Sequence, residues 1–471
     1  MNPVSAGGNN PLLHLNNWLL DGCGPMSVVG LTGPARAYFF ARFLDTLNKP
    51  CLVILPEKKR AERFYRELRF FMGSPKNGNH GAAIRLHRFP PYDMSPLTGL
   101  SPHRQLITER INALYALMTD PNPVVVTCPE ALCFRVLPKT SLIDALEYLE
   151  KGEEVDREDF IKTLEINGYQ RSSMVEERGD YSVRGGVIDV FTPLYPLPMR
   201  LEFWGDRLES IRQFDPISQR SEMGLNELTL LPACEIIMGQ KNIKRARSMG
   251  RLPGSSDARI GFPGQEAWLN HFYDHLDTLI RYLPQKSLLT LVDPISVEPT
   301  GQKIEKKFQK DIVKYREESA VRGEPFPDIE GIFVPFTKIA EHMEGHQQLL
   351  FSALNVGNEN TAGNTLEIAG RFDIEDDLEI RLAVKGRISM APFARKIDTW
   401  ISSGAQVVIT CSTLQQANRL KEILGNYDVA VDRVVHGWHE VGKRRGLIVC
   451  LDRLARGFAW PDLGLYVGSE D

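Results

Sequence analysis

The first residues whose types and spacing could do chemistry lie between the aliphatic run SVVGL and a helical segment that opens at Gly33. Nucleotide-binding proteins place the phosphate loop Gly-x4-Gly-Lys-Ser/Thr at such a turn from strand to helix. Aligned on Gly30, this sequence has Ala35, Arg36 and Ala37 where that loop has a second glycine, a lysine and a magnesium-binding hydroxyl. An alanine cannot bind a metal, and the guanidinium of arginine does not replace the loop lysine. We therefore expect this unit to keep a packing role without binding nucleotide.

The second half of such a nucleotide site is altered as well. The apolar run LLTLV at 288–292 leads into Asp293, where an ATP-driven motor holds its magnesium ion. The next residue is Pro294, which can neither act as a base nor donate a backbone hydrogen bond. We expect no catalytic residues, no cofactor and no metal site in this chain. An alternative stays open, in which the altered loop still binds nucleotide through Arg36.

A different kind of site is indicated between Gly168 and Glu222, where seven arginines occur without a lysine. Arginine is favoured at protein interfaces because its planar guanidinium binds two acceptors at once and is less costly to desolvate than an ammonium. Nine acidic residues share the segment, so its mixed charge suits a protein partner better than a phosphate backbone. Strict alternation through YSVRGGVIDVF turns Arg184 toward solvent. Phe191 and Phe203 fit an interface anchor and a core position equally well.

The composition excludes several classes of protein. A hydrophobic content of 42%, a charged content of 25% and a formal net charge of −4 are ordinary for a globular protein and give no general reason for nucleic-acid binding. The sequence shows no apolar run of membrane-spanning length and no secretory signal, so we expect a cytoplasmic protein without membrane contact. Seven scattered cysteines without a CxxC pair favour buried thiols over disulfides or a zinc site.

Two weaker signals each have a structural and a functional interpretation. The histidines of HFYDH and HMEGH have the i, i+4 spacing of metal ligands, but no third ligand is evident, which favours ordinary surface histidines. Basic clusters at 58–60, 241–247 and 442–445 favour solvated faces. A DNA-binding scaffold, whose duplex affinity would fall steeply with salt, stays open as a third interpretation of the chain.

The order of apolar runs and helical periods predicts an α/β fold in several parts. From residue 26 to about 135 short aliphatic runs alternate with helices, as in a parallel sheet. A small α+β insert follows, with an antiparallel hairpin around Gly205 and Asp206, and NVGNENTAGN at 355–364 reads as a surface loop. The last residues read as a strand that stops abruptly, so we expect a piece of a longer protein. The predicted parts are a first α/β segment at 1–140, the insert at 141–222, a second α/β segment at 223–336 and a C-terminal α/β domain at 337–471.

Several stretches resemble the excision-repair protein UvrB, and more closely the UvrB-like N-terminal part of bacterial transcription-repair coupling factors. The altered phosphate loop is the coupling factors' pattern, and the segment from 88 to 112 is short where UvrB carries its damage-probing hairpin. The resemblance implies a degenerate helicase-type parallel-sheet domain with a small α+β insert, followed by a second α/β domain. The stretches are GLTGPARAYFFARF, residues 109–132, GYQRSSMVEERGDYSVRGGVIDVF, RLEFWGDRLESIRQFDPISQR and LLTLVDP.

The resemblance also implies partners. Coupling factors displace stalled RNA polymerase with an ATP-dependent DNA translocase, which by family order follows the part matched here together with a polymerase-binding domain. They recruit UvrA through the insert domain. The UvrA-contacting residues of UvrB fall on Arg171, Arg184, Arg200 and Glu202, and we add Phe191 to this predicted set.

One position departs from the UvrB pattern. Ser182 stands where UvrB has a further arginine, so we expect a smaller or differently tuned interface. The resemblance implies that the C-terminal domain of the resting full-length protein masks this surface. We therefore expect an isolated piece to bind UvrA more readily than the whole protein.

Overall fold

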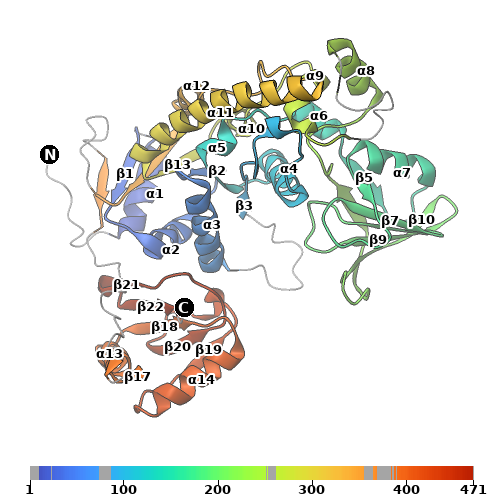
Figure 1. Ribbon diagram of the computed structural model, residues 1–471. Helices are drawn as coiled ribbons and strands as arrows, with labels where there is room; N and C mark the ends of the chain where they lie inside the picture. The colour runs from blue at the N-terminus through green and yellow to red at the C-terminus, as the bar shows by residue number, and fades with distance from the viewer. Residues whose placement is uncertain are drawn as a thin grey trace.

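A computed structural model of the chain describes residues 10–22, 24–73, 86–250, 252, 261–354, 364–368, 383–384, 387–388 and 390–469. Within these ranges, a parallel sheet flanked by helices carries a small sheet domain at one end, drawn in green in Figure 1. A second α/β domain, drawn in red, packs against the helices nearest the N-terminus (Figure 1).

The central sheet has seven strands in the order β15-β1-β14-β13-β2-β4-β3. Every pairing within it is parallel, which confirms the predicted α/β class. Its inner strands are buried along most of their length because helices cover both faces. The strands are β1 Met26–Val29, β2 Cys51–Ile54, β3 Leu86–Arg88, β4 Val124–Thr127, β13 Leu288–Val292, β14 Gln347–Ser352 and β15 Thr365–Glu367.

Alternation along β2 divides the core into two layers. Cys51 and Val53 belong to one buried cluster, whereas Leu52 and Ile54 belong to another on the opposite face. The first cluster includes residues of α1 (Pro11–Asp21), α2 (Gly33–Leu44) and α3 (Lys58–Met72). The helices of the second cluster are α4 Arg104–Thr119, α5 Pro129–Leu132, α6 Lys139–Asp144, α8 Gln240–Met249, α9 Leu269–Phe272, α10 Leu279–Tyr282, α11 Pro294–Arg322 and α12 Phe336–Met343.

The structure moves the domain boundary that the sequence placed at residue 337. Helix α12 packs in the same buried cluster as α11, and β14 lies between β1 and β13 in the central sheet. Strand β15 pairs with β1 as well, so the first domain continues at least to residue 367. Parallel sheets accept neighbours that are distant in sequence, and local patterns do not reveal them. Residues 355–363 of the predicted loop lie outside the described residues.

The insert domain is built on a six-stranded sheet in the order β11-β10-β9-β8-β7-β6. A two-stranded ribbon of β5 (Glu147–Glu150) and β12 (Glu227–Leu230) forms its neck, so the insert extends past the predicted end at 222. Helix α7 (Arg157–Ile166) packs on one face of the sheet. The strands are β6 Gln170–Arg171, β7 Asp180–Arg184, β8 Val187–Val190, β9 Met199–Trp204, β10 Arg207–Phe214 and β11 Ser221–Leu225.

The C-terminal domain has a five-stranded sheet in the order β19-β20-β18-β22-β21. On one face, Val407 and Val449 pack in the cluster that contains residues of the helices α13 and α14. On the other face, Val408, Ile448 and Val467 join the buried cluster that contains residues of α2 and α3. The helices of the first domain therefore form the second layer of this sheet. The elements are α13 Ala391–Ser402, β18 Gln406–Thr410, α14 Leu414–Gly425, β19 Arg433–Val435, β20 Gly446–Cys450, β21 Phe458–Trp460 and β22 Leu465–Ser469.

Aromatic side chains fill the contact between these two domains. The ring of Tyr38 on α2 lies 5.8 Å from Trp438, 5.6 Å from Phe458 and 6.1 Å from Trp460, measured between ring centroids. Phe71 on α3 lies 5.0 Å from Trp438. Aromatic pairs in this range add about 0.5–1.5 kcal/mol each beyond the area they bury. We call these five residues the aromatic seam.

Candidate functional site

The altered nucleotide site lies where β1 and β13 end and α2 and α11 begin. A cavity of about 620 Å³ opens there, lined by residues of α2, α3 and α11 and by Arg456 of the C-terminal domain. Gly33 lines the cavity, while Ala35 and Ala37 are fully buried beside it. Gly30 has a φ of 101°, and a Cβ there would lie 2.3 Å from a carbonyl oxygen, so only glycine fits.

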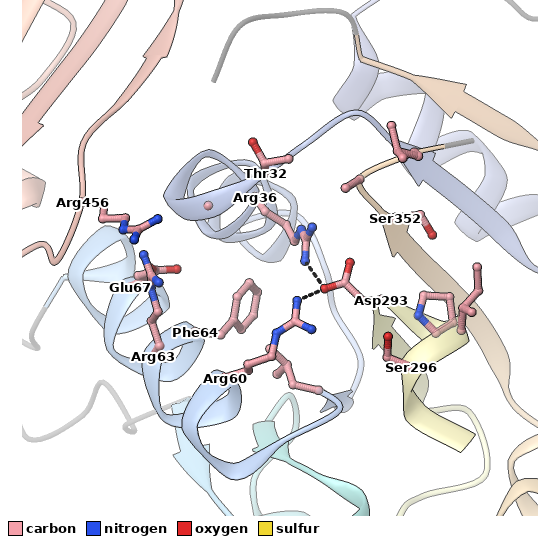
Figure 2. Close-up of a pocket in the computed structure, with 16 residues that line it drawn as sticks. Thr32, Arg36, Arg60, Arg63, Phe64, Glu67, Asp293, Ser296, Ser352 and Arg456 are labelled. Atoms are coloured by element: carbon pink, nitrogen blue, oxygen red, sulfur yellow. Dashed lines mark hydrogen bonds and ion pairs between the residues drawn. The ribbon is translucent and has the colours of Figure 1, made fainter. Parts of the chain in front are cut away.

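Arg36 and Asp293 meet in this cavity although 257 residues separate them in the sequence. The Arg36 guanidinium donates to the Leu31 carbonyl at 3.2 and 3.0 Å and to the Asp293 carboxylate at 3.3 Å. Arg60 of α3 reaches the same carboxylate from the other side (Figure 2). Asp293, the residue at the magnesium-binding position of related motors, is thus neutralised by two arginines.

A second ion pair lines the same cavity. Arg63 donates to the buried Glu67 carboxylate at 2.9 Å. Burial raises the pKa of Glu67, and the hydrogen bond from Arg63 opposes that rise. The cavity therefore holds carboxylates that are already matched by guanidinium groups of the chain itself. The sequence singled out Arg36 and Asp293 but treated Arg60 as part of a solvated basic cluster, and no local signal indicated its contact with Asp293.

The predicted partner-binding residues gather on the insert sheet. Arg171 and Arg184 are exposed, and Arg184 donates to the Ser173 carbonyl. Arg200 binds Asp189 through two hydrogen bonds of 2.7 and 2.9 Å. Glu202 accepts from Arg212 and, at 2.7 Å, from Ser210. These four predicted residues share one sheet but differ in availability, because Arg200 and Glu202 are engaged within it.

The segment YSVRGGVIDVF is a hairpin and not the single alternating strand that the sequence suggested. Strands β7 and β8 pair antiparallel, with Gly185 and Gly186 at the turn. Gly185 has a φ of 58°, and a Cβ on Gly186 would lie 2.7 Å from the Phe203 carbonyl oxygen. Arg184 is nevertheless exposed, whereas Ser182 is buried.

The structure corrects the assignment of Phe191 to the partner-binding surface. Phe191 is 7% exposed, packs with Val175 and Phe214, and lies beneath the Arg178 guanidinium. Phe203 is buried in the main core of the insert. Both phenylalanines are therefore core residues and not interface anchors. The sequence analysis missed Trp204, a large apolar residue of this sheet that is 82% exposed.

The remaining signals find structural explanations. The sequence favoured a surface position for His271, but the structure buries it against Trp268. Burial lowers the pKa of His271. Among the described residues, no group of three or more metal-binding side chains is assembled. Every cysteine in the described ranges is buried. The part of the chain that the structure describes contains no helix both long and apolar enough to cross a membrane.

Comparisons with known proteins agree with this arrangement. The family model of the UvrB interaction domain matches residues 148–235, which are the insert domain and its neck. The chain is 28% identical over 250 residues to UvrABC system protein B of Thermosipho africanus, which covers 51% of this chain and 37% of that protein. The fold and the matched domain make the chain similar to UvrB.

The chain is also similar to the N-terminal part of transcription-repair-coupling factors, as its sequence predicted. It is 30% identical over 425 residues to that of Myxococcus xanthus, covering 85% of this chain and 34% of that protein. It is 24% identical over 441 residues to that of Bacillus subtilis, covering 88% of this chain and 35% of that protein. The chain spans about a third of the length of these curated relatives.

Proposed function

We propose that this chain is a nucleotide-free adaptor that binds UvrA and so recruits excision repair to lesions at stalled RNA polymerase. The observation that carries the proposal is the insert domain, where a match to the UvrB interaction domain coincides with an exposed, arginine-rich sheet. The coupling-factor relatives support a place in cytoplasmic transcription-coupled repair. Contacts with RNA polymerase and DNA, the translocase activity and the masking of the insert fall to other regions of such a protein.

The ion pairs of the cavity support the absence of ATP hydrolysis. A magnesium ion bound by Asp293 would have to displace Arg36 and Arg60 from it, which would leave the buried Arg36 guanidinium without this counter-charge. The loop also offers Ala37 where a hydroxyl would hold the metal.

Titration of purified UvrA against this chain tests the proposal directly. We expect saturable binding that Arg184→Glu weakens by about 30-fold, because truncating or reversing an arginine within an interface is among the most costly changes. Arg220→Glu is the matched control, since it makes the same charge change in the exposed loop after β10. No binding by the unaltered chain, or equal losses in the two variants, would contradict the proposal.

A nucleotide titration separates the adaptor from the second candidate, a nucleotide-binding helicase-type protein. The adaptor predicts no saturable, magnesium-dependent ATP binding. The second candidate predicts binding that Arg36→Ala abolishes. A third candidate is a DNA-binding scaffold. It predicts an affinity for duplex DNA that falls steeply with salt, with a slope of several units when the logarithm of the affinity is plotted against the logarithm of the salt concentration.

A further inference from the structure

We infer that Trp204 is the apolar anchor residue of the insert domain, which becomes buried in the protein partner upon binding. This inference rests on the proposed binding of UvrA. The sequence contains six tryptophans, and the fold leaves the other five buried or half-buried, whereas Trp204 is 82% exposed. Burying an indole away from water is favourable, and binding hot spots of protein interfaces are enriched in tryptophan. No contact within the described residues explains its position.

Trp204 extends the row of residues already predicted to meet UvrA. Along β9, Leu201 and Phe203 are buried, while Arg200, Glu202 and Trp204 alternate with them on the opposite face. The pairing of Val187 with Glu202 places the turn of the β7–β8 hairpin beside the tip of β9. The Arg184 end of one hairpin and the Trp204 end of the next therefore form one continuous edge.

The backbone beneath Trp204 is held in place before any partner arrives. The Phe203 amide donates to the Gly186 carbonyl at 2.7 Å, which joins the two hairpin tips. On the other side, the Val155 amide donates to the Asp206 carbonyl at 2.7 Å, and the Leu208 amide donates to the Glu153 carbonyl at 3.0 Å. A side chain presented on a fixed backbone loses little further freedom on binding, which favours affinity.

The charges around Trp204 indicate what its partner offers. Glu202 is paired with Arg212, and Arg207 with Glu209, within the sheet itself. Among the residues that the structure describes, Arg184 meets a carbonyl group and no carboxylate, so its charge stays uncompensated. The edge thus combines an indole with charges of both signs, among them Arg184 and the exposed Asp206. We expect the matching surface on UvrA to offer an apolar pocket for the indole and a carboxylate that pairs with Arg184.

A nucleic acid fits this edge less well, although an indole could stack on a base. The segment from Gly168 to Glu222 contains nine acidic residues against seven arginines, so the surface as a whole does not attract a phosphate backbone.

The test measures the dissociation constant of UvrA for three variants of the chain. Trp204→Ala should raise the constant by about tenfold or more, because a central aromatic anchor supplies a large share of binding energy. Trp204→Phe should keep most of the affinity, since it retains a ring. Ile217→Ala is the matched control: Ile217 is 93% exposed in the loop after β10, at the far end of the same sheet, and its loss should leave binding unchanged.

Intrinsic fluorescence gives an independent readout. UvrA binding should shift the emission of the unaltered chain to shorter wavelength, and this shift should be absent from Trp204→Phe. Binding of the unaltered chain with no change in Trp204→Ala would overturn the inference while the proposed function stands. No binding by the unaltered chain would overturn both. If Trp204→Ala weakened binding to DNA but not to UvrA, the edge would be assigned to nucleic acid, and the inference would be overturned as well.

Discussion

Arg110 is fully buried and depends on one acidic partner. It donates to Glu235 at 2.6 Å and to the Pro90 carbonyl at 3.0 Å, and its guanidinium lies over the rings of Phe89 and Tyr92. Burial alone would lower the pKa of Arg110, but the charge of Glu235 raises it overall. The pair ties α4 to the segment by which the chain leaves the insert domain.

We predict that Glu235→Gln destabilises the first domain by about 3–5 kcal/mol, because it leaves a buried guanidinium without a counter-charge. Tyr92→Phe is the control, since it removes only the hydroxyl that donates to Glu235 at 2.6 Å, and it should cost about 2 kcal/mol. Urea denaturation of both variants measures the difference. Equal losses would show that the charge of Glu235 contributes nothing beyond its hydrogen bonds.

Glu266 makes stability depend on pH. Burial raises its pKa to about 7, although the Ser101 hydroxyl donates to it at 3.0 Å. Its proton is held more tightly in the folded state than in the unfolded state, so its contribution to stability is fully present below pH 4.5 and is lost as the pH rises to 7. We predict that the unfolding free energy of the unaltered protein falls by roughly 3 kcal/mol over this pH range because of Glu266, and that Glu266→Gln abolishes this fall. Denaturation at pH 5 and pH 8 checks this, and parallel profiles for the two proteins would count against it.

At the scale of elements, two helical glycines should respond to alanine in opposite ways. Gly301 lies within α11, where a Cβ would approach the Cβ of Phe336 on α12 to 2.4 Å. We expect Gly301→Ala to cost about 1–3 kcal/mol by pushing the helices apart. A Cβ on Gly425 at the end of α14 meets nothing within 4 Å, so Gly425→Ala should be neutral or stabilising by up to about 1 kcal/mol. Thermal denaturation of both variants distinguishes packing from intrinsic helix propensity.

Many of the elements could be predicted from sequence, but their neighbours in the sheets could not. The apolar run at 124–127 and the hairpin at Gly205 carry their own signals, because alternation and turn residues act locally. The place of β14 depends on pairing with β13 and with β1, which lies near the start of the chain, and no local pattern encodes these pairings. The residues of the candidate sites differ in the same way. Arg184 was predicted from its strand, whereas the contact of Arg60 with Asp293 and the exposure of Trp204 depend on how distant elements pack.

At the scale of the whole molecule, the C-terminal sheet relies on the first domain for one of its two layers. Expressed alone, residues 390–471 would expose the apolar face that includes Val408 and Ile448 together with Phe458 and Trp460 of the aromatic seam. We predict that this piece aggregates or binds a hydrophobic dye strongly, while the complete chain does not, because exposed apolar patches of this kind drive association. Light scattering and dye fluorescence measure it. If the isolated fragment stayed soluble and bound no dye, its sheet would have to repack without α2 and α3.

The neck of the insert has a consequence for how such chains can be recombined. The insert leaves and rejoins the first domain through adjacent strands of one ribbon, in which Glu150 faces Glu227 and Glu147 faces Leu230. Paired residues of antiparallel strands lie only about 5 Å apart. The two ends can therefore be joined by a short turn after excision, or grafted onto any host hairpin. The partner-binding surface is in this sense portable, and it could be transplanted without redesigning the sheet that carries it.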